Sequence, residues 1–181
     1  MSINLFGCND LSLGGIKELK LATKDINNKP LSFPLDIQLL SGDDSIIVIQ
    51  EDLVNQIITI GGVEIQYRSV FPYNARYVED EVTGRQGRYY TKTLSFEMPK
   101  LNLTTNNQLK DFLFSSNGEF AISSMICFVV DTNNNTWVLG WDSPLILQTL
   151  DLQTDINQGD NKYLINYLSN SYSRIRQYYV I

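Results

Sequence analysis

Apolar and polar side chains alternate along several segments of this chain, and this period of two constrains its fold more than any other feature. Residues 63–70 (VEIQYRSV) and 88–98 (RYYTKTLSFEM) show it most clearly, and Pro99 ends the second run. Side chains of a β-strand point alternately to its two faces, so the pattern is typical of a strand with one face toward a core. We expect both segments to be strands and to pair with each other.

Shorter runs of the same character recur through the chain. They lie at residues 15–23, 45–50, 56–60, 121–131, 136–142, 144–152, 162–168 and 173–181. Residues 104–116 differ, because Leu109, Phe112 and Leu113 have helical spacing and follow Thr and Asn residues suited to an N-cap. The sequence therefore predicts a mainly β protein: an antiparallel β-sandwich or small β-barrel with one flanking α-helix.

The length of 181 residues suits one domain, and we expect a single domain over residues 1–181. Cys8 and Cys127 form neither a zinc spacing nor a disulfide framework. No apolar run reaches the roughly 18 residues that a membrane helix requires, so we expect no membrane partner. The formal net charge of -6 disfavours binding to DNA or anionic lipid, since both require cationic neutralisation.

The chain contains no histidine, which removes the usual general base near neutral pH and the Ser-His and Cys-His dyads. Carboxylates such as Asp43, Asp44 and Glu97 remain candidates for a hydrolase site, which would need a cleft and perturbed pKa values. Metal-assisted phosphoryl chemistry would need further carboxylates converging from other strands. We expect no enzymatic activity, no cofactor and no metal centre.

A stripe of large apolar side chains follows three asparagines in DTNNNTWVLGWD, residues 131–142. Trp137 and Trp141, exposed together, would form a stacking platform for a sugar and make the chain a carbohydrate-binding β-sandwich module. Core packing on a half-buried strand produces the same stripe, and we favour the core. Gly140, on the opposite face, indicates a bulge or a close backbone approach.

The same segment has the ligand spacing of a calcium loop at Asp131, Asn133 and Asn135. Thr136 stands where that loop requires a glycine. Asparagine tolerates the positive φ of tight hairpin turns, so we favour a turn between two strands over a metal site.

The segment VEDEVTGRQGR, residues 78–88, has no apolar anchor and predicts an extended exposed loop. Its charges are segregated, acidic first and basic second. Such a loop is suited to contact a copy of itself on a neighbouring subunit, and the alternative is a solvated hairpin tip without a partner. The candidate contact residues are Glu79, Asp80, Glu81, Arg85 and Arg88.

Tyrosines gather toward the C-terminal end, at Tyr163, Tyr167, Tyr172, Tyr178 and Tyr179. Tyrosine is enriched at protein interfaces, where one side of the residue is dry and the other wet. We expect the final segment either to complete the sheet or to dock on another subunit, with Tyr178 and Tyr179 as candidate contacts.

Three stretches together resemble a known class of proteins: GGIKELKLAT, YYTKTLSFEMPKL followed by LKDFL, and VVDTNNNTWVLGWDSPLIL. Their order and style resemble the tail-tube-like and neck-ring structural proteins of bacteriophages, including the ring proteins of crAss-like and related Bacteroidetes phages. The resemblance covers most of the chain and depends on no single motif.

The resemblance implies a subunit of a homo-oligomeric ring, a hexamer or dodecamer, in the phage tail or neck. The ring would surround the DNA ejection channel and stack on other tail or neck proteins. It would be made in the bacterial host cytoplasm and reside in the virion, with no catalytic residue. An acidic channel wall would repel phosphate and let DNA pass without specific binding.

Overall fold

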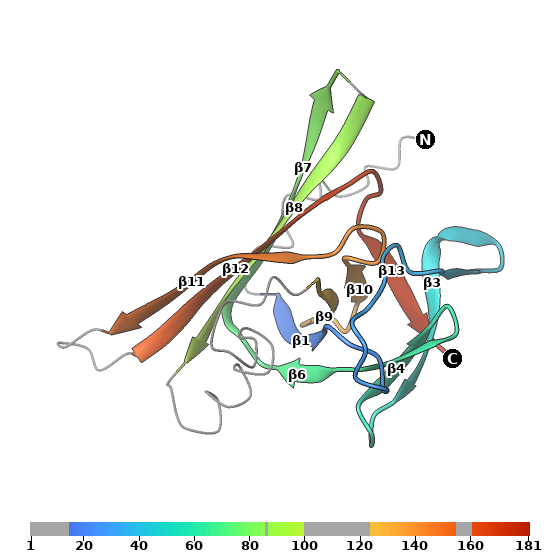
Figure 1. The fold of residues 1–181 in the computed structure, drawn as a ribbon, viewed down its shortest axis with the longest axis horizontal. Coiled ribbons are helices and arrows are strands. Elements are labelled where there is room, and N and C mark those ends of the chain that lie inside the picture. The colour runs from blue at the N-terminus through green and yellow to red at the C-terminus, as the bar shows by residue number, and fades with distance from the viewer. Residues whose placement is uncertain (1–14, 86, 100–123, 155–160) are drawn as a thin grey trace.

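The structure is a computed structural model that describes residues 15–85, 87–99, 124–154 and 161–181. All regular secondary structure within these residues is β-strand, as Figure 1 shows. The predicted mainly β class is confirmed. The predicted flanking helix at residues 104–116 lies outside the described residues, and the described part of the chain lends it no support.

Most strands lie close to the segments that the alternation predicts, whereas β2 and β7 fall outside the predicted segments. They are β1 (Ile16–Ala22), β2 (Gln38–Leu40), β3 (Asp43–Asp52), β4 (Ile57–Ile60), β5 (Val63–Gln66), β6 (Arg68–Val70), β7 (Tyr73–Gly84), β8 (Gly87–Pro99), β9 (Ile126–Asp131), β10 (Thr136–Leu139), β11 (Ile146–Thr154), β12 (Asn161–Ser171) and β13 (Arg176–Val180).

The larger sheet has nine strands in the order β5-β4-β3-β13-β10-β9-β1-β6, with β2 paired beside β3. Only Tyr67 separates its two end strands, β5 and β6, along the chain. The sheet therefore curls until its ends meet at this residue, whose backbone N–H donates to Gln56 O at 2.9 Å. No ladder joins β5 to β6 among the described strands, so the sheet is curled but open. The small closed β-barrel, one of the two predicted architectures, is therefore wrong.

The smaller sheet has four antiparallel strands in the order β11-β12-β8-β7. Its strand β8 pairs with β7 and β12, while residues 63–70 divide into β5 and β6, which pair with β4 and β1. The predicted pairing of residues 63–70 with residues 88–98 is wrong. Alternation determines which face of a strand is buried but carries no information on its neighbour.

Residues 78–88 do not form the predicted irregular loop, and the hairpin of the stated alternative is the conformation observed. Strands β7 and β8 continue in register from Val78↔Thr93 to Gly84↔Gly87, as one long hairpin that projects from the body (Figure 1). Cross-strand hydrogen bonds and pairs hold such a ribbon even where neither face meets a core, so an apolar anchor is unnecessary there.

Two hydrophobic clusters lie on opposite faces of the larger sheet. Strand β9 serves both, because Cys127 and Val129 belong to the cluster between the sheets, while Ile126 and Phe128 belong to the cluster inside the curl. A strand buried on both faces reads as a continuous apolar run, which explains MICFVV. The smaller sheet contributes Leu94, Phe96, Ile165 and Tyr167 to the first cluster, so the two sheets pack as a sandwich.

The asparagine segment after β9 is a turn, as predicted. The carboxylate of Asp131 accepts hydrogen bonds from the backbone N–H groups of Asn133 and Asn135, each at 2.8 Å. Asn134 has a φ of 61°. Asp131 therefore caps the turn between β9 and β10 with its own side chain.

Candidate interaction site

The outer part of the β7–β8 hairpin carries most of the predicted contact residues. Arg85 and Asp80 are exposed, and the side chain of Arg88 is 73% exposed. Glu81 accepts from Arg88 across the hairpin and from Arg174 of the segment before β13, with both N–O distances at 3.3 Å. The predicted segregation of charge therefore persists in three dimensions, with arginines at the tip and carboxylates behind it.

Glu79 differs from its neighbours, because it is only 6% exposed. Its Oε2 accepts hydrogen bonds from the Tyr77 hydroxyl and from the backbone N–H of Ile175, both at 2.8 Å. The predicted role of Glu79 as an exposed contact does not fit this burial. The residue points inward on β7 and joins the base of the hairpin to the segment that precedes β13.

A buried lysine lies beside this anchor. Lys92 on β8 is fully buried, and its Nζ lies 3.1 Å from Ser171 Oγ and 3.8 Å from Asp142 Oδ1. The Ser171 hydroxyl also contacts the Asp142 carboxylate and accepts from the Ser173 backbone N–H at 3.0 Å. Burial lowers the pKa of Lys92, and the carboxylates of Asp142 and Glu79 oppose that shift.

Sequence reasoning missed this network, although it left a signal. Lys92 occupies the same face of its strand as Leu94 and Phe96, which the alternation assigns to the core. A lysine in phase with core residues requires buried partners, because an unpaired buried charge is costly. The partners, Asp142 and Ser171, lie far from Lys92 in the sequence, so the alternation of side chains could not identify them.

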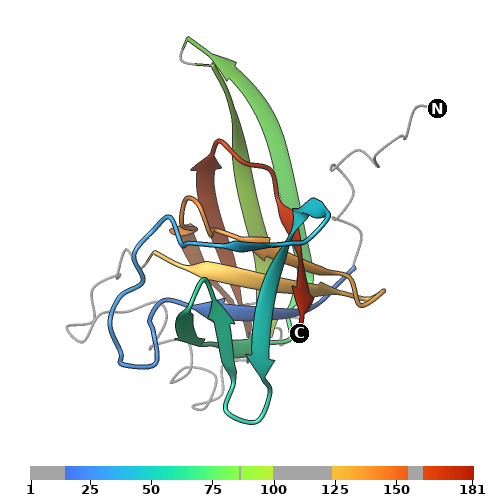
Figure 2. The ribbon, with the colours of Figure 1, turned by 90° about the vertical axis from the view of Figure 1, so that its right-hand side faces the viewer.

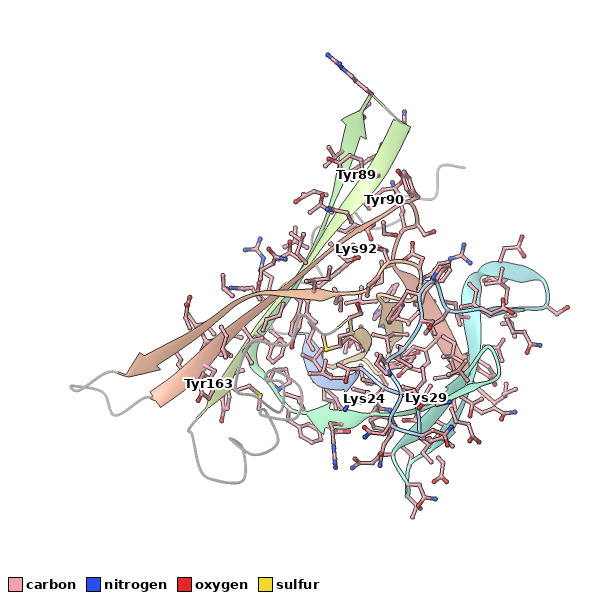
Figure 3. All side chains as sticks on the ribbon, in the orientation of Figure 1. Lys24, Lys29, Tyr89, Tyr90, Lys92 and Tyr163 are labelled. Carbon is pink, nitrogen blue, oxygen red and sulfur yellow. The ribbon has the colours of Figure 1, made fainter. Side chains whose placement is uncertain are left out.

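A cavity of about 520 Å³ lies between the hairpin tip and the end of β12. It is lined by Gly84, Arg85, Gly87 and Tyr89 of the hairpin and by residues 170–172. Figure 3 shows Tyr89 and Tyr90 on the projecting part of the hairpin, with Lys92 nearer the body.

The lining of this cavity combines a cation, aromatic rings and a fixed wall. Within the described part of the chain, Arg85 has no ion-pair partner, and Tyr172 is 75% exposed. Ser171 accepts a hydrogen bond from the buried Lys92 ammonium group, which fixes this part of the cavity wall. Such a surface is suited to an anionic group attached to an apolar one.

The two C-terminal tyrosines have opposite environments. Tyr178 is 3% exposed, and its ring packs edge-to-face on Phe128 at a centroid distance of 5.6 Å. Its predicted role in subunit contact does not fit this burial, because β13 lies inside the larger sheet between β3 and β10. Tyr179 is 55% exposed on the other face of the strand. The C-terminal segment therefore completes the sheet, as one of the two alternatives predicted.

The two tryptophans do not share a platform. Trp137 packs against the cluster between the sheets, whereas Trp141 is 9% exposed and belongs to the cluster inside the curl. Gly140, with a φ of +84°, separates them, and a Cβ there would lie 2.7 Å from Met125 O. This close approach is the one that the sequence predicted. The sugar platform of the alternative hypothesis is not present in this arrangement.

The candidate hydrolase carboxylates lie in different sheets. Asp43 and Asp44 begin β3 in the larger sheet, while Glu97 on β8 pairs with Lys162 at 3.1 Å in the smaller one. Among the described residues, no group of three or more His, Cys, Asp or Glu side chains is arranged to hold a metal ion. No helix in the described ranges is long and apolar enough to cross a membrane.

No protein-family model matches this chain, and searches of the curated proteins and of the solved structures gave no match.

Proposed function

We propose that this chain is a non-enzymatic structural subunit that assembles into a ring in a phage tail or neck, around the DNA ejection channel. The resemblance of its sequence to ring proteins motivates the proposal. The observation that carries it is the β7–β8 hairpin, which extends beyond the body and ends in exposed charge.

A long exposed hairpin has a cost that assembly would offset. Two-stranded ribbons are at best marginally stable alone in water, and the outer part of this one has no core to pack on. Here the base is fixed by Glu79 and Lys92, so the arm is held in one orientation before any partner binds. Preorganisation of this kind reduces the entropy lost on association.

The sheet edges offer a second route to assembly. Strands β7 and β11 are the edges of the smaller sheet, and β11 has nine residues. Edge strands present unpaired backbone N–H and C=O groups to which another chain can add. A closed set of such contacts between identical subunits yields a ring.

The net charge of -6 suits the proposed channel, because an acidic protein does not neutralise DNA phosphates. Other phage tail or neck proteins would be the neighbours above and below. The proposal includes no cofactor, since the function requires only contact surfaces.

The test is the native mass of the purified chain by light scattering. A matched variant replaces residues 83–88 with Asn-Gly, a two-residue turn that closes on the Val82↔Tyr89 pair and leaves Glu79 and Lys92 in place. We expect the wild-type chain to form a ring of several 20.6-kDa subunits and the variant to lose mass.

Folding of the shortened variant is checked by its circular dichroism and urea unfolding, which should match the wild type. A wild-type chain that remains at 20.6 kDa at every concentration would contradict self-assembly. A ring that is unchanged in the shortened variant would remove the hairpin from the interface.

A further inference from the structure

The turn between β3 and β4 is the most prominent apolar projection of the described residues. Leu53 is 70% exposed and Val54 is 91% exposed, side by side at its tip. Isolated exposed apolar side chains are common, but two adjacent ones on a protruding turn form a small contact surface.

Hydrogen bonds to Asp52 close this turn, and the same side chain gives it a negative charge. Asp52 Oδ1 accepts from the backbone N–H groups of Val54 and Asn55 at 3.0 and 3.1 Å, and Oδ2 accepts from Asn55 Nδ2 at 2.7 Å. The hydrogen bonds from Asn55 and Val54 lower the pKa of Asp52, so its carboxylate stays ionised. We call residues 52–55 the knob.

The cavity at the hairpin tip has the complementary chemistry. Arg85 supplies a positive charge that complements the negative charge of the Asp52 carboxylate. The rings of Tyr89 and Tyr172 supply apolar surface for the two apolar side chains of the knob. Its volume of about 520 Å³ lies in the range of roughly 300–1,000 Å³ that is usual for ligand sites.

The knob and the cavity lie at opposite ends of the molecule. In Figures 1 and 2 the β7–β8 hairpin extends from the top of the body, and the β3–β4 turn forms its lower end. One copy cannot fill its own cavity. A second copy can fill it with its own knob. The resulting pair still has one free knob and one free cavity, so further copies can add.

We infer that the knob of one copy occupies the hairpin-tip cavity of the next copy, as a head-to-tail contact. The inference rests on the proposed function and names the surfaces through which its subunits would join. A contact between two different surfaces generates a closed ring if the rotation per subunit closes, and an open filament if it does not.

Two variants, each blocked at one surface, test the contact. Leu53→Ser with Val54→Ser removes the knob side chains and keeps the Asp52 cap. Arg85→Glu with Tyr172→Ser reverses the charge of the cavity and removes a ring. Each variant alone should fall to 20.6 kDa. An equal mixture should form a one-to-one dimer, because each chain supplies the surface that the other lacks.

Matched controls lie elsewhere on the surface. Phe71→Ser removes an apolar side chain that is 66% exposed, and Arg68→Glu reverses an exposed charge on β6. Both controls should assemble as the wild type does. Equal loss of assembly in the controls and in the blocked variants would overturn the inference.

Disulfide trapping detects the contact even when it is weak. In a Cys8→Ser background, Val54→Cys with Tyr172→Cys should give a ladder of cross-linked dimers, trimers and larger species on mild oxidation. Val54→Cys with Phe71→Cys is the control and should give at least tenfold less.

The outcomes separate the two proposals. If the wild type forms rings and both blocked variants form the same rings, the head-to-tail contact is wrong and ring assembly stands. If the wild type stays monomeric and the cysteine pair gives no ladder, self-assembly and this contact both fail.

Discussion

Glu79 Oε2 accepts a hydrogen bond of 2.8 Å from the backbone N–H of Ile175, which ties the hairpin strand β7 to the residue just before β13. The bond joins the smaller sheet to the larger one at the base of the projecting arm. It also satisfies a backbone donor that lies apart from any ladder. The base of the hairpin is therefore attached to both sheets.

Replacing Glu79 with alanine should destabilise the fold by about 1–3 kcal/mol, because the Ile175 N–H loses its acceptor. The free energy of unfolding in urea measures the change. The matched control, Asp80→Ala on the exposed face of the same strand, should stay within about 0.5 kcal/mol. Equal effects at the two positions would show that the hydrogen bond contributes nothing specific.

Asp142→Asn should cost about 3–5 kcal/mol, because Lys92 would remain buried without its nearest negative charge. Adding Lys92→Met to the same chain should recover part of that loss, since the buried ammonium group that lost its nearest carboxylate would be gone. A double-mutant cycle in urea measures the coupling. Additive effects of the two substitutions would contradict a direct interaction between them.

The stability of the Asp142→Asn variant should rise with pH. Burial lowers the folded-state pKa of Lys92, so below the unfolded value of about 10.4 the unfolded chain binds more protons. Stability is therefore lost as pH falls through the folded-state pKa and regained as pH rises toward the unfolded one. Urea unfolding at pH 7 and at pH 9.5 tests the sign, with the wild type as the reference. A flat profile would contradict it.

The Tyr167→Phe variant should gain stability relative to the wild type as the pH rises above 10. Burial raises the pKa of Tyr167, so the folded hydroxyl stays protonated while the unfolded one ionises near pH 10. The free energy of unfolding of the wild type therefore falls as the pH rises above the unfolded pKa, whereas the variant lacks this group and its contribution. Paired unfolding curves at pH 8 and at pH 10.5 measure the change, and Tyr179→Phe at an exposed tyrosine is the control.

Gly140→Ala should destabilise the fold by more than about 2 kcal/mol. The positive φ of +84° alone costs about 1–2 kcal/mol, and the new Cβ would lie 2.7 Å from Met125 O. Gly62 has a φ of +78° and open space around its Cβ position, so Gly62→Ala carries the conformational cost alone. Thermal unfolding of both variants separates the two terms. Equal losses of stability in the two variants would show that the contact with Met125 O adds no steric cost at Gly140.

Prediction from the sequence succeeded where the signal is local. The alternation of residues 88–98 gives the buried face of β8 correctly, with Leu94 and Phe96 in the core. The asparagines after Asp131 form the predicted turn, because the Asp131 carboxylate accepts hydrogen bonds from the backbone N–H groups of Asn133 and Asn135. Gly140 lies at a close backbone approach, as a glycine in a strand indicates.

Prediction failed where the answer depends on distant segments. The expected pairing of residues 63–70 with 88–98 was wrong, because any two amphipathic strands satisfy the same pattern. Glu79 and Tyr178 were expected on the surface, and burial assigns both to the interior. Neither the Lys92 network nor the hairpin-tip cavity is visible in the sequence, since each combines segments some 80 residues apart.

The sequence by itself determined that this chain is a mainly β protein, which faces of its strands are buried and where the asparagine turn lies, because these follow from interactions between near neighbours. Only the tertiary structure decided which strands pair, that β9 separates two hydrophobic clusters and that residues 78–88 continue as a hairpin. Those choices depend on which distant surfaces bury one another best. That free energy belongs to the whole fold and to no single segment.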